Sequence, residues 1–210
     1  MSPGSLLLAT RSPDKVREIR RILGPLAGLR LVDLDAAGVE VLREEDDVEV
    51  YDTFEENARA KALYFHRRTG FPTVADDSGL VVDALEGAPG VRSKRFAPDS
   101  DVLSGLERDR ANNEHLLSLL GDLELSRRTA RYVCVASLID GGEESFFRGE
   151  AEGLILGLPR GRGGFGYDPL FYDRGLGLTF AEIEGEEKNR RSHRGKAFRK
   201  LRHHLLEEGE

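Results

Sequence analysis

The sequence predicts an α/β fold with a mixed sheet, and three observations lead to that fold class. Helical and strand-like segments alternate along most of the chain. One long hairpin, two apolar runs joined by Gly141 and Gly142, breaks the alternation and adds antiparallel pairing. The 210 residues contain no repeat and no low-complexity linker, so we expect a single domain over 1–210.

The first elements are two strands with a helix between them. Apolar runs at 6–9 and 29–34 predict the strands. Ser12 is a typical N-cap residue, and Pro13 suits the first position of the helix. An apolar stripe with helical spacing follows this start, so a helix is expected directly after the first strand.

A second helix is predicted from its two ends. Thr53 and Glu56 have the spacing of a capping box, and Gly70 suits the residue after the last turn. Two short strands are expected next, at 74–76 and 80–84. The remaining expected elements are a helix at 107–120, hairpin strands at 132–140 and 145–156, and a last helix at 193–207.

Composition is that of an ordinary globular protein, with 33% charged and 39% apolar residues. No apolar run approaches the roughly 18 residues of a membrane span, and the start of the chain lacks a basic leader, so neither a membrane partner nor a signal peptide is expected. The single cysteine, Cys134, excludes an internal disulfide and falls in a strand-like run. We therefore expect an inert buried thiol and a cytoplasmic protein.

Charge is distributed unevenly around a net value of −7. The stretch Arg43–Glu56 carries eight acidic residues, whereas Lys188–His204 carries eight Lys or Arg and three His. Such asymmetry suits a metal-attracting region and an anion-attracting region. Two solvated surfaces are the alternative reading of the same pattern.

The first candidate site is the stretch "ATRSPDK". A strand runs into Thr10, Arg11 and Ser12, and a helix begins just after them. Exposed backbone N–H groups and the helix dipole suit a phosphate there, and Lys15 lies within the first turn. The stretch lacks the Gly-rich run of a Walker A loop. An ordinary capped helix is the alternative.

Two neighbouring acids, Asp76 and Asp77, end the expected strand at 74–76. Adjacent like charges are unfavourable unless a positive charge lies near them. Magnesium favours one or two carboxylates with phosphate oxygens and water, and Glu44, Glu45 or Glu49 could add a ligand. The pattern leaves open which of the three does so.

Two further motifs point to a nucleotide. In "GGFGYDPLF", glycines allow close approach of the backbone, and Phe165 and Tyr167 offer faces on which a planar base can stack. In "EKNRRSHRGKA", Lys188 and Arg194 are phosphate-binding types, and Ser192 suits the cap of the last helix. A mobile loop and a solvated basic helix are the alternatives. Taken together, the four sites describe a nucleoside triphosphate with magnesium.

These blocks resemble the inosine/xanthosine triphosphate pyrophosphatases, which remove deaminated purine nucleotides. The resemblance covers nearly the whole chain and rests on "ATRSPDK", "TFEENARAKA" with "ADDSGLVVDALEGAPGVRS", "GGFGYDPLF" and "EKNRRSHRGKA", in the family's order. Ser12 departs from the family's usual Asn, and Arg11 stands where a small residue is common. The family implies an elongated α/β fold with two lobes around a deep nucleotide-binding cleft, and a homodimer.

The resemblance also implies roles for individual residues. Asp77 becomes the general base and a magnesium ligand, with Glu49 as the upstream metal-binding glutamate. Thr10 to Lys15 and Lys188 are expected to hold the triphosphate, and His193 and Arg194 to read the 6-oxo group of the base. The complete set of expected substrate-binding residues is Thr10, Arg11, Ser12, Pro13, Asp14, Lys15, Ser78, Phe165, Gly166, Tyr167, Asp168, Lys188, His193 and Arg194.

The expected activity is a hydrolase reaction that cleaves dITP, ITP or XTP into a nucleoside monophosphate and pyrophosphate. A nucleic-acid-binding protein is the rival from another class, but an acidic chain bearing paired aspartates repels phosphate. A hydrolase of modified pyrimidine triphosphates would lack the His193–Arg194 pair. We therefore expect a nucleotide substrate, no nucleic acid and no membrane.

Overall fold

The computed structural model describes residues 4–26 and 28–207, which fold into two compact units. The first unit consists of Met1–Asp77, Cys134–Gly149 and His193–Glu210, and the second consists of Ser78–Val133 and Glu150–Ser192. The chain therefore passes from one unit to the other at four points. A single domain over 1–210 stays a prediction.

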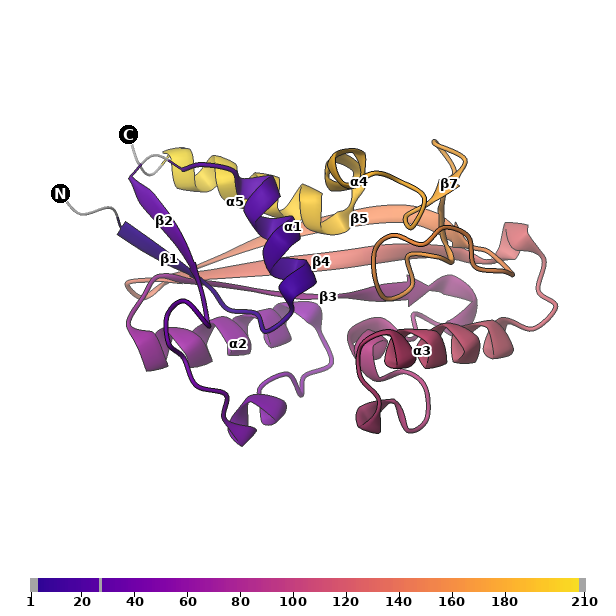
Figure 1. Cartoon of the computed structure of the whole chain (residues 1–210), viewed down its shortest axis with the longest axis horizontal. Coiled ribbons are helices and arrows are strands. Elements are labelled where there is room, and N and C mark those ends of the chain that lie inside the picture. Colours follow the sequence, from indigo (N-terminus) through magenta and orange to yellow (C-terminus); the bar gives the residue numbers. More distant parts are fainter. Residues whose placement is uncertain (1–3, 27, 208–210) are drawn as a thin grey trace. The chain divides into compact units, whose positions relative to one another are not determined.

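Seven strands hydrogen-bond in the order β2-β1-β3-β4-β5-β6-β7 (Figure 1). β1 pairs in parallel with β2 and β3, whereas β6 pairs antiparallel with β5 and β7. The mixed sheet expected from the sequence is therefore confirmed. The strands are β1 (Gly4–Leu8), β2 (Leu29–Asp33), β3 (Thr73–Val82), β4 (Thr129–Asp140), β5 (Glu143–Ile155), β6 (Phe171–Asp173) and β7 (Leu178–Thr179).

The helices alternate with the strands through the first two thirds of the chain. They are α1 (Pro13–Leu23), α2 (Phe54–Thr69), α3 (Gly105–Leu120), α4 (Gly185–Arg191) and α5 (His193–Glu207). Short 3-10 helices occupy Arg43–Asp47 (η1), Asp83–Leu85, Gly90–Arg95, Ser100–Val102 and Leu125–Arg127. The sequence did not predict α4, β6, β7 or the 3-10 helices, which are too short for a clear periodicity.

Helix ends follow the predicted capping. The Ser12 hydroxyl accepts a hydrogen bond from the Lys15 amide, and Pro13 opens α1. The Thr53 hydroxyl accepts from the Glu56 amide at 3.2 Å and donates to the Glu56 carboxylate at 2.7 Å. Gly70, with φ of 71°, closes α2 in the left-handed conformation that glycine favours.

In the first unit, alternating side chains of β1 divide the core into two layers. Leu6 and Leu8 pack with residues of α1 and α5, whereas Leu7 packs with residues of α2. Accordingly, α1 and α5 lie on one side of β1 and α2 lies on the other (Figure 1). Cys134 is fully buried between the strands and the α1–α5 layer, and burial raises the pKa of its thiol, as expected of an inert cysteine.

The second unit has a core of its own, formed by α3 and the far halves of the long strands. Leu116 and Leu120 of α3 pack in one cluster with Leu80 of β3 and Ile155 of β5. Phe171 of β6 lies in the same cluster and is fully buried.

The hairpin is confirmed, but one strand prediction is wrong. Gly141 and Gly142 connect β4 and β5 with φ of 54° and 101°, as a tight turn between twisted strands requires. The two short strands expected at 74–76 and 80–84 are instead one strand, β3, which continues through both aspartates to Val82. The acids do not end the strand, because cations from other elements surround them, as described below.

Candidate active site

Asp76 lies in the first unit at the centre of a cluster of cations. Its Oδ2 atom is 2.9 Å from Lys15 Nζ of α1 and 3.4 Å from Arg194 Nε of α5. Burial alone would raise the pKa of Asp76, but Lys15, Arg194 and Lys61 hold it well below its ordinary value. Arg194 is anchored a second time, with NH1 2.6 Å from the Glu18 carboxylate. Asp76 is therefore a permanent anion that fixes the cations around it.

Asp77, the next residue of β3, has the opposite electrostatics. Burial raises its pKa to about 6, the Lys61 ammonium opposes that shift, and the Glu49 carboxylate adds to it. Asn57 Nδ2 donates to Asp77 Oδ2 at 3.1 Å. Asp77 is thus a carboxylate poised near neutral pH, with one oxygen held by an amide.

Lys61 of α2 links the acids of this cluster, and the sequence analysis did not single it out. Its ammonium donates to the Glu49 carboxylate and, at 2.6 Å, to the backbone carbonyl of Asp76. Burial alone would lower the pKa of Lys61, but Glu49 and Asp76 raise it, so Lys61 stays charged. The available signal was the spacing of Asn57 and Lys61, four residues apart on one helix face.

Of the three glutamates considered as metal ligands, Glu49 lies in the cluster. Burial alone would raise its pKa, yet Lys61 and Lys15 lower it, so it is ionised. Glu45 is bound by Arg11 instead, and Glu44 is exposed. The geometry therefore favours Glu49, the glutamate that the family resemblance implied, as the partner of Asp77.

Asp77 and Glu49 suit a magnesium ion that is shared with phosphates. Glu49 raises the pKa of Asp77, because the two negative charges repel each other. A divalent cation would offset that repulsion. Among the described residues, no group of three or more His, Cys, Asp and Glu could hold a metal. Magnesium commonly takes one or two carboxylates and completes its shell with phosphate oxygens and water. The donor set fits that mode, in which the protein supplies only part of the shell.

The charged side chains at the junction of β1 and α1 point in different directions. Thr10 and Ser12 accept hydrogen bonds from the loop's own backbone, at 3.2 and 3.4 Å, and Asp14 pairs with Arg17. Lys15 points to Asp76, whereas Arg11 points to Glu45 of η1. Pro13 opens the helix. Only Lys15 of this stretch therefore joins the acidic cluster through its side chain.

His193 and Arg194 begin α5 and are buried. The backbone of β5 passes close to this helix start, because a Cβ atom on Gly149 would lie 2.2 Å from the His193 carbonyl oxygen. Arg194 bonds to Asp76 and Glu18, so its guanidinium belongs to the cluster of the first unit. Its contact to a base stays a prediction.

The glycine-rich loop lies in the second unit and is organised by Asp168. Asp168 Oδ2 accepts from the Phe165 amide at 2.9 Å and from Lys188 Nζ of α4 at 2.7 Å. Lys188 also lies over the Phe165 ring, 5.1 Å from its centroid. Gly164 cannot be replaced, since a Cβ atom there would lie 2.0 Å from Asp168 Oδ2. Lys188 thus joins Phe165 and Asp168, whereas Lys15 joins the first unit's cluster.

Helix α3 holds the same loop from its other side. Asp109 accepts from the Gly166 amide at 2.8 Å, and Asn113 donates to the Gly166 carbonyl at 2.9 Å. The Tyr167 hydroxyl donates to the Ser93 carbonyl at 2.8 Å, and its ring is buried, so it is not free to stack on a ligand in this arrangement. Sequence reasoning missed Asp109 and Asn113, whose partners are backbone groups distant in the chain.

The predicted residues are therefore divided between the two units. The first unit contains Thr10, Arg11, Ser12, Pro13, Asp14, Lys15, Glu49, Asp77, His193 and Arg194, and the second contains Ser78, Phe165, Gly166, Tyr167, Asp168 and Lys188. Their roles stay predictions.

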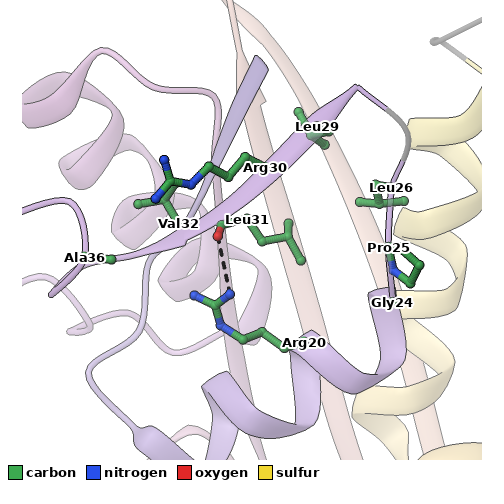
Figure 2. A pocket seen from close by; sticks show the side chains of 9 residues that line it. All are labelled: Arg20, Gly24, Pro25, Leu26, Leu29, Arg30, Leu31, Val32 and Ala36. Atoms are coloured by element: carbon green, nitrogen blue, oxygen red, sulfur yellow. Dashed lines mark hydrogen bonds between the residues drawn. The ribbon is translucent and has the colours of Figure 1, made fainter. Parts of the chain in front are cut away.

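A pocket of about 510 Å³ lies apart from these residues, between the end of α1 and β2 (Figure 2). Arg20, which lines it, donates to the Leu31 carbonyl at 3.4 Å and to the Asp33 carboxylate at 2.8 Å. The pocket contains none of the predicted site residues. Its lining is Arg20, Gly24, Pro25, Leu26, Leu29, Arg30, Leu31, Val32 and Ala36.

Comparison with known proteins identifies the family. A model of the Ham1 family matches residues 6–204. This chain belongs to the Ham1 family. It is 47% identical over 213 aligned positions to the dITP/XTP pyrophosphatase of Symbiobacterium thermophilum, with both chains covered completely. It is also 47% identical to a dITP/XTP pyrophosphatase of Thermus thermophilus, over 93% of this chain and 89% of that protein.

Solved structures of Ham1 proteins share the fold. The HAM1 protein of Coxiella burnetii matches with a TM-score of 0.83 and 34% identity, over 97% of this chain and 99% of that one. The nucleoside-triphosphatase, or dITP/XTP pyrophosphatase, of Mycobacterium abscessus matches with a TM-score of 0.72 and 41% identity, over 94% and 98%. The family and the α/β fold expected from the four motifs are thereby confirmed. The two lobes and the deep cleft stay predictions.

Within the described ranges, every helix falls short of the length and apolarity needed to cross a lipid bilayer.

Proposed function

We propose that this Ham1 protein hydrolyses dITP, ITP and XTP to the nucleoside monophosphate and pyrophosphate, and so removes deaminated purines from the nucleotide pool. The observation that carries the proposal is Asp77, a buried carboxylate whose pKa is raised to about 6 beside Lys61 and Glu49. A base is most effective when its pKa lies near the working pH. The relatives from Symbiobacterium and Thermus bear the name dITP/XTP pyrophosphatase, which supports the same substrate class.

In this proposal Asp77 accepts a proton from the attacking water. Asn57 holds one carboxylate oxygen, so the other is directed by a fixed side chain. The water attacks the α-phosphorus, the bond to the β-phosphate oxygen breaks, and pyrophosphate leaves. Lys15, Lys61 and the amides at the start of α1 supply positive charge for the phosphates.

Asp77 and Glu49 would hold magnesium with the phosphates of the substrate. When bound, the ion neutralises charge that develops on the leaving pyrophosphate. The permanent anion Asp76 keeps Lys15 and Arg194 in place without taking part in the proton transfer.

Three side chains, Phe165, His193 and Arg194, are proposed to bind the base. Phe165 offers a face for stacking, with its backbone held by Asp168 and its neighbour Gly166 held by α3. His193 and Arg194 are proposed to donate to the 6-oxo group, which inosine and xanthosine carry and adenine lacks. Guanine also has a 6-oxo group, so its rejection depends on position 2.

The metal, the assembly and the location of the protein are part of the same proposal. We infer magnesium as the metal, a homodimer as the assembly, and a cytoplasmic location where nucleotide pools are found. Sedimentation velocity over a concentration series tests the assembly: a single species with the mass of one 23.3 kDa chain would contradict the dimer.

A panel of nucleoside triphosphates tests the function. The protein is incubated with MgCl₂ and dITP, ITP, XTP, dGTP, ATP or dUTP, and the products are separated by anion-exchange chromatography. We expect monophosphate and pyrophosphate from the first three substrates and little from the others. Cleavage of ATP or dUTP with dITP left intact would refute the substrate class, and release of orthophosphate with a diphosphate would refute the assigned bond.

A further inference from the structure

Arg11 stands in the stretch expected to hold phosphates, but most of its donors are already used. Nε and NH2 donate to the two oxygens of Glu45, at 3.0 and 2.8 Å. NH1 donates to the Val39 carbonyl at 2.9 Å, and NH2 donates to the Glu40 carbonyl at 3.1 Å. The Asp35 carboxylate lies 3.5 Å from NH1. Four of the five N–H donors of the guanidinium are thus used, and the Asp35 carboxylate lies beside the fifth, so a phosphate would have to compete with carboxylates for Arg11.

Glu45 is held as firmly from its own side. It lies near the start of η1 and also accepts from Arg68 of α2 at 3.3 Å and from the Leu42 amide at 3.3 Å. Burial alone would raise the pKa of Glu45. The hydrogen bond from Arg11 is the main opposing effect, and the pKa is lowered overall. Arg11 and Glu45 therefore form a charged, two-pronged bond between the loop after β1 and η1.

The segment that contains η1 has little else to hold it. No residue of η1 is buried, and Val41 just before it is 73% exposed. A segment with few buried apolar contacts depends on its polar bonds for a defined position. Arg68 adds one such bond to the Glu40 carbonyl, at 3.2 Å. Val39 itself packs against the core of the first unit, so the polar bonds made by Arg11 and Arg68 fix the stretch that follows it, residues 40–47.

Glu49 follows two residues after η1 and is the residue of this segment that reaches Lys61. Its position beside Asp77 depends on where η1 ends, because two residues of backbone leave little slack. We propose that Arg11 is a positioning residue that acts through Glu45: it sets η1, and thereby directs Glu49 toward Lys61 and the metal, and it does not contact the phosphates. This inference rests on the proposed function for its catalytic consequence alone.

The test compares Arg11→Lys and Glu45→Gln with the wild-type protein. Lysine keeps the charge but cannot make the two-pronged bond, and glutamine keeps the shape but loses the charge. Arg20→Lys is the matched control. Like Arg11, Arg20 pairs with a carboxylate distant in the sequence, that of Asp33, but both residues lie outside the segment. Each protein is measured for hydrogen exchange over 39–53 without metal, and for the Mg²⁺ concentration that half-activates dITP hydrolysis.

We expect faster exchange over 39–53 in both variants and an increase of about 10-fold in the half-activating Mg²⁺ concentration, the usual effect of losing a residue that orients a metal ligand. The KM for dITP at saturating Mg²⁺ should stay unchanged. The double variant should be no worse than the more affected single variant, because both changes remove one interaction. Arg20→Lys should match the wild type.

Two results would overturn the inference. A higher KM for dITP at saturating Mg²⁺ in Arg11→Lys, with exchange unchanged, would make Arg11 a phosphate ligand. Wild-type exchange and wild-type Mg²⁺ dependence in both variants would leave the pair without a role. If the wild-type protein fails to hydrolyse dITP, the proposed function falls, and the exchange over 39–53 still decides whether Arg11 holds the segment.

Discussion

Each unit of the protein contains a Lys–Asp pair with a buried aspartate, and the two pairs differ in their surroundings. Lys15 and Asp76 are 2.9 Å apart in the first unit, and Lys188 and Asp168 are 2.7 Å apart in the second. Asp76 also faces the cations Arg194 and Lys61, whereas Asp168 is bonded to one cation and to backbone and hydroxyl donors.

The difference shows how one carboxylate becomes reactive. In the second unit each charge has its partner, and the pair holds a loop. In the first unit, Lys61 is shared between Glu49, Asp76 and Asp77, so the acids compete for it. Asp76 stays ionised, whereas burial raises the pKa of Asp77 to about 6 and the Glu49 carboxylate adds to that shift. Of these neighbouring residues of one strand, Asp76 is a structural anion and Asp77 is the carboxylate that we propose as the base.

The largest expected effect is on turnover, and it tests the role of Asp77. Asp77→Asn should lower kcat for dITP by about 10²–10⁴-fold, the usual contribution of a general base, while nucleotide binding persists. Steady-state kinetics and equilibrium binding of dITP to the variant measure both parts. Asp83→Asn, at an exposed aspartate that pairs with Arg131, is the control. Retained turnover in Asp77→Asn would remove Asp77 from the base role.

The comparison of the two pairs predicts unequal losses of stability. Asp76→Asn leaves Lys15 and Arg194 without their shared anion and should lower the free energy of unfolding by about 3–5 kcal/mol. Asp168→Asn leaves one cation and keeps an oxygen for the Phe165 amide, so its loss should lie at the lower end of that range, about 3 kcal/mol. Urea unfolding at pH 7.5 (roughly physiological) measures both. Equal losses would show that the extra cations do not depend on Asp76.

The raised pKa of Asp77 predicts a stability difference that depends on pH. The fold favours the protonated carboxyl, so this contribution is present below about pH 4 and is lost as the pH rises through about 6. A shift of about two units corresponds to about 3 kcal/mol. In EDTA, Asp77→Asn should match the wild type near pH 4 and exceed its unfolding free energy by about 3 kcal/mol above about pH 7.

Urea unfolding of both proteins across this pH range tests that prediction. Magnesium should raise the melting temperature of the wild type at about pH 8 more than that of Asp77→Asn, since the ion binds the ionised carboxylate. A stability difference that is constant with pH would show that Asp77 titrates normally.

The smallest expected effect concerns the base. Phe165→Leu removes the stacking surface but keeps an apolar side chain, so KM for dITP should rise by an amount corresponding to about 1–2 kcal/mol, with kcat little changed. Phe146→Leu, at a half-exposed ring in the first unit, is the control. An unchanged KM would show that Phe165 supports the loop without contacting the base.

Local structure could be predicted where local chemistry determines it. The caps at Ser12 and Thr53 and the turn at Gly141 and Gly142 follow from residues within one turn of the chain, and the structure confirms them. The family follows from motifs that are contiguous in the sequence. Asp77 was singled out because two adjacent acids follow an apolar, strand-like run, and its role came from the family resemblance.

Only the tertiary structure decided which partners those residues have. Asp76 and Asp77 were expected to end a strand, because the cations that let β3 continue come from α1, α2 and α5. The sequence pattern left Glu44, Glu45 and Glu49 open, and only the structure shows that Glu45 is bound by Arg11, 34 residues away, while Glu49 reaches Lys61. Charges are visible in a sequence, but their energies depend on distance and burial, which the packing of distant elements sets.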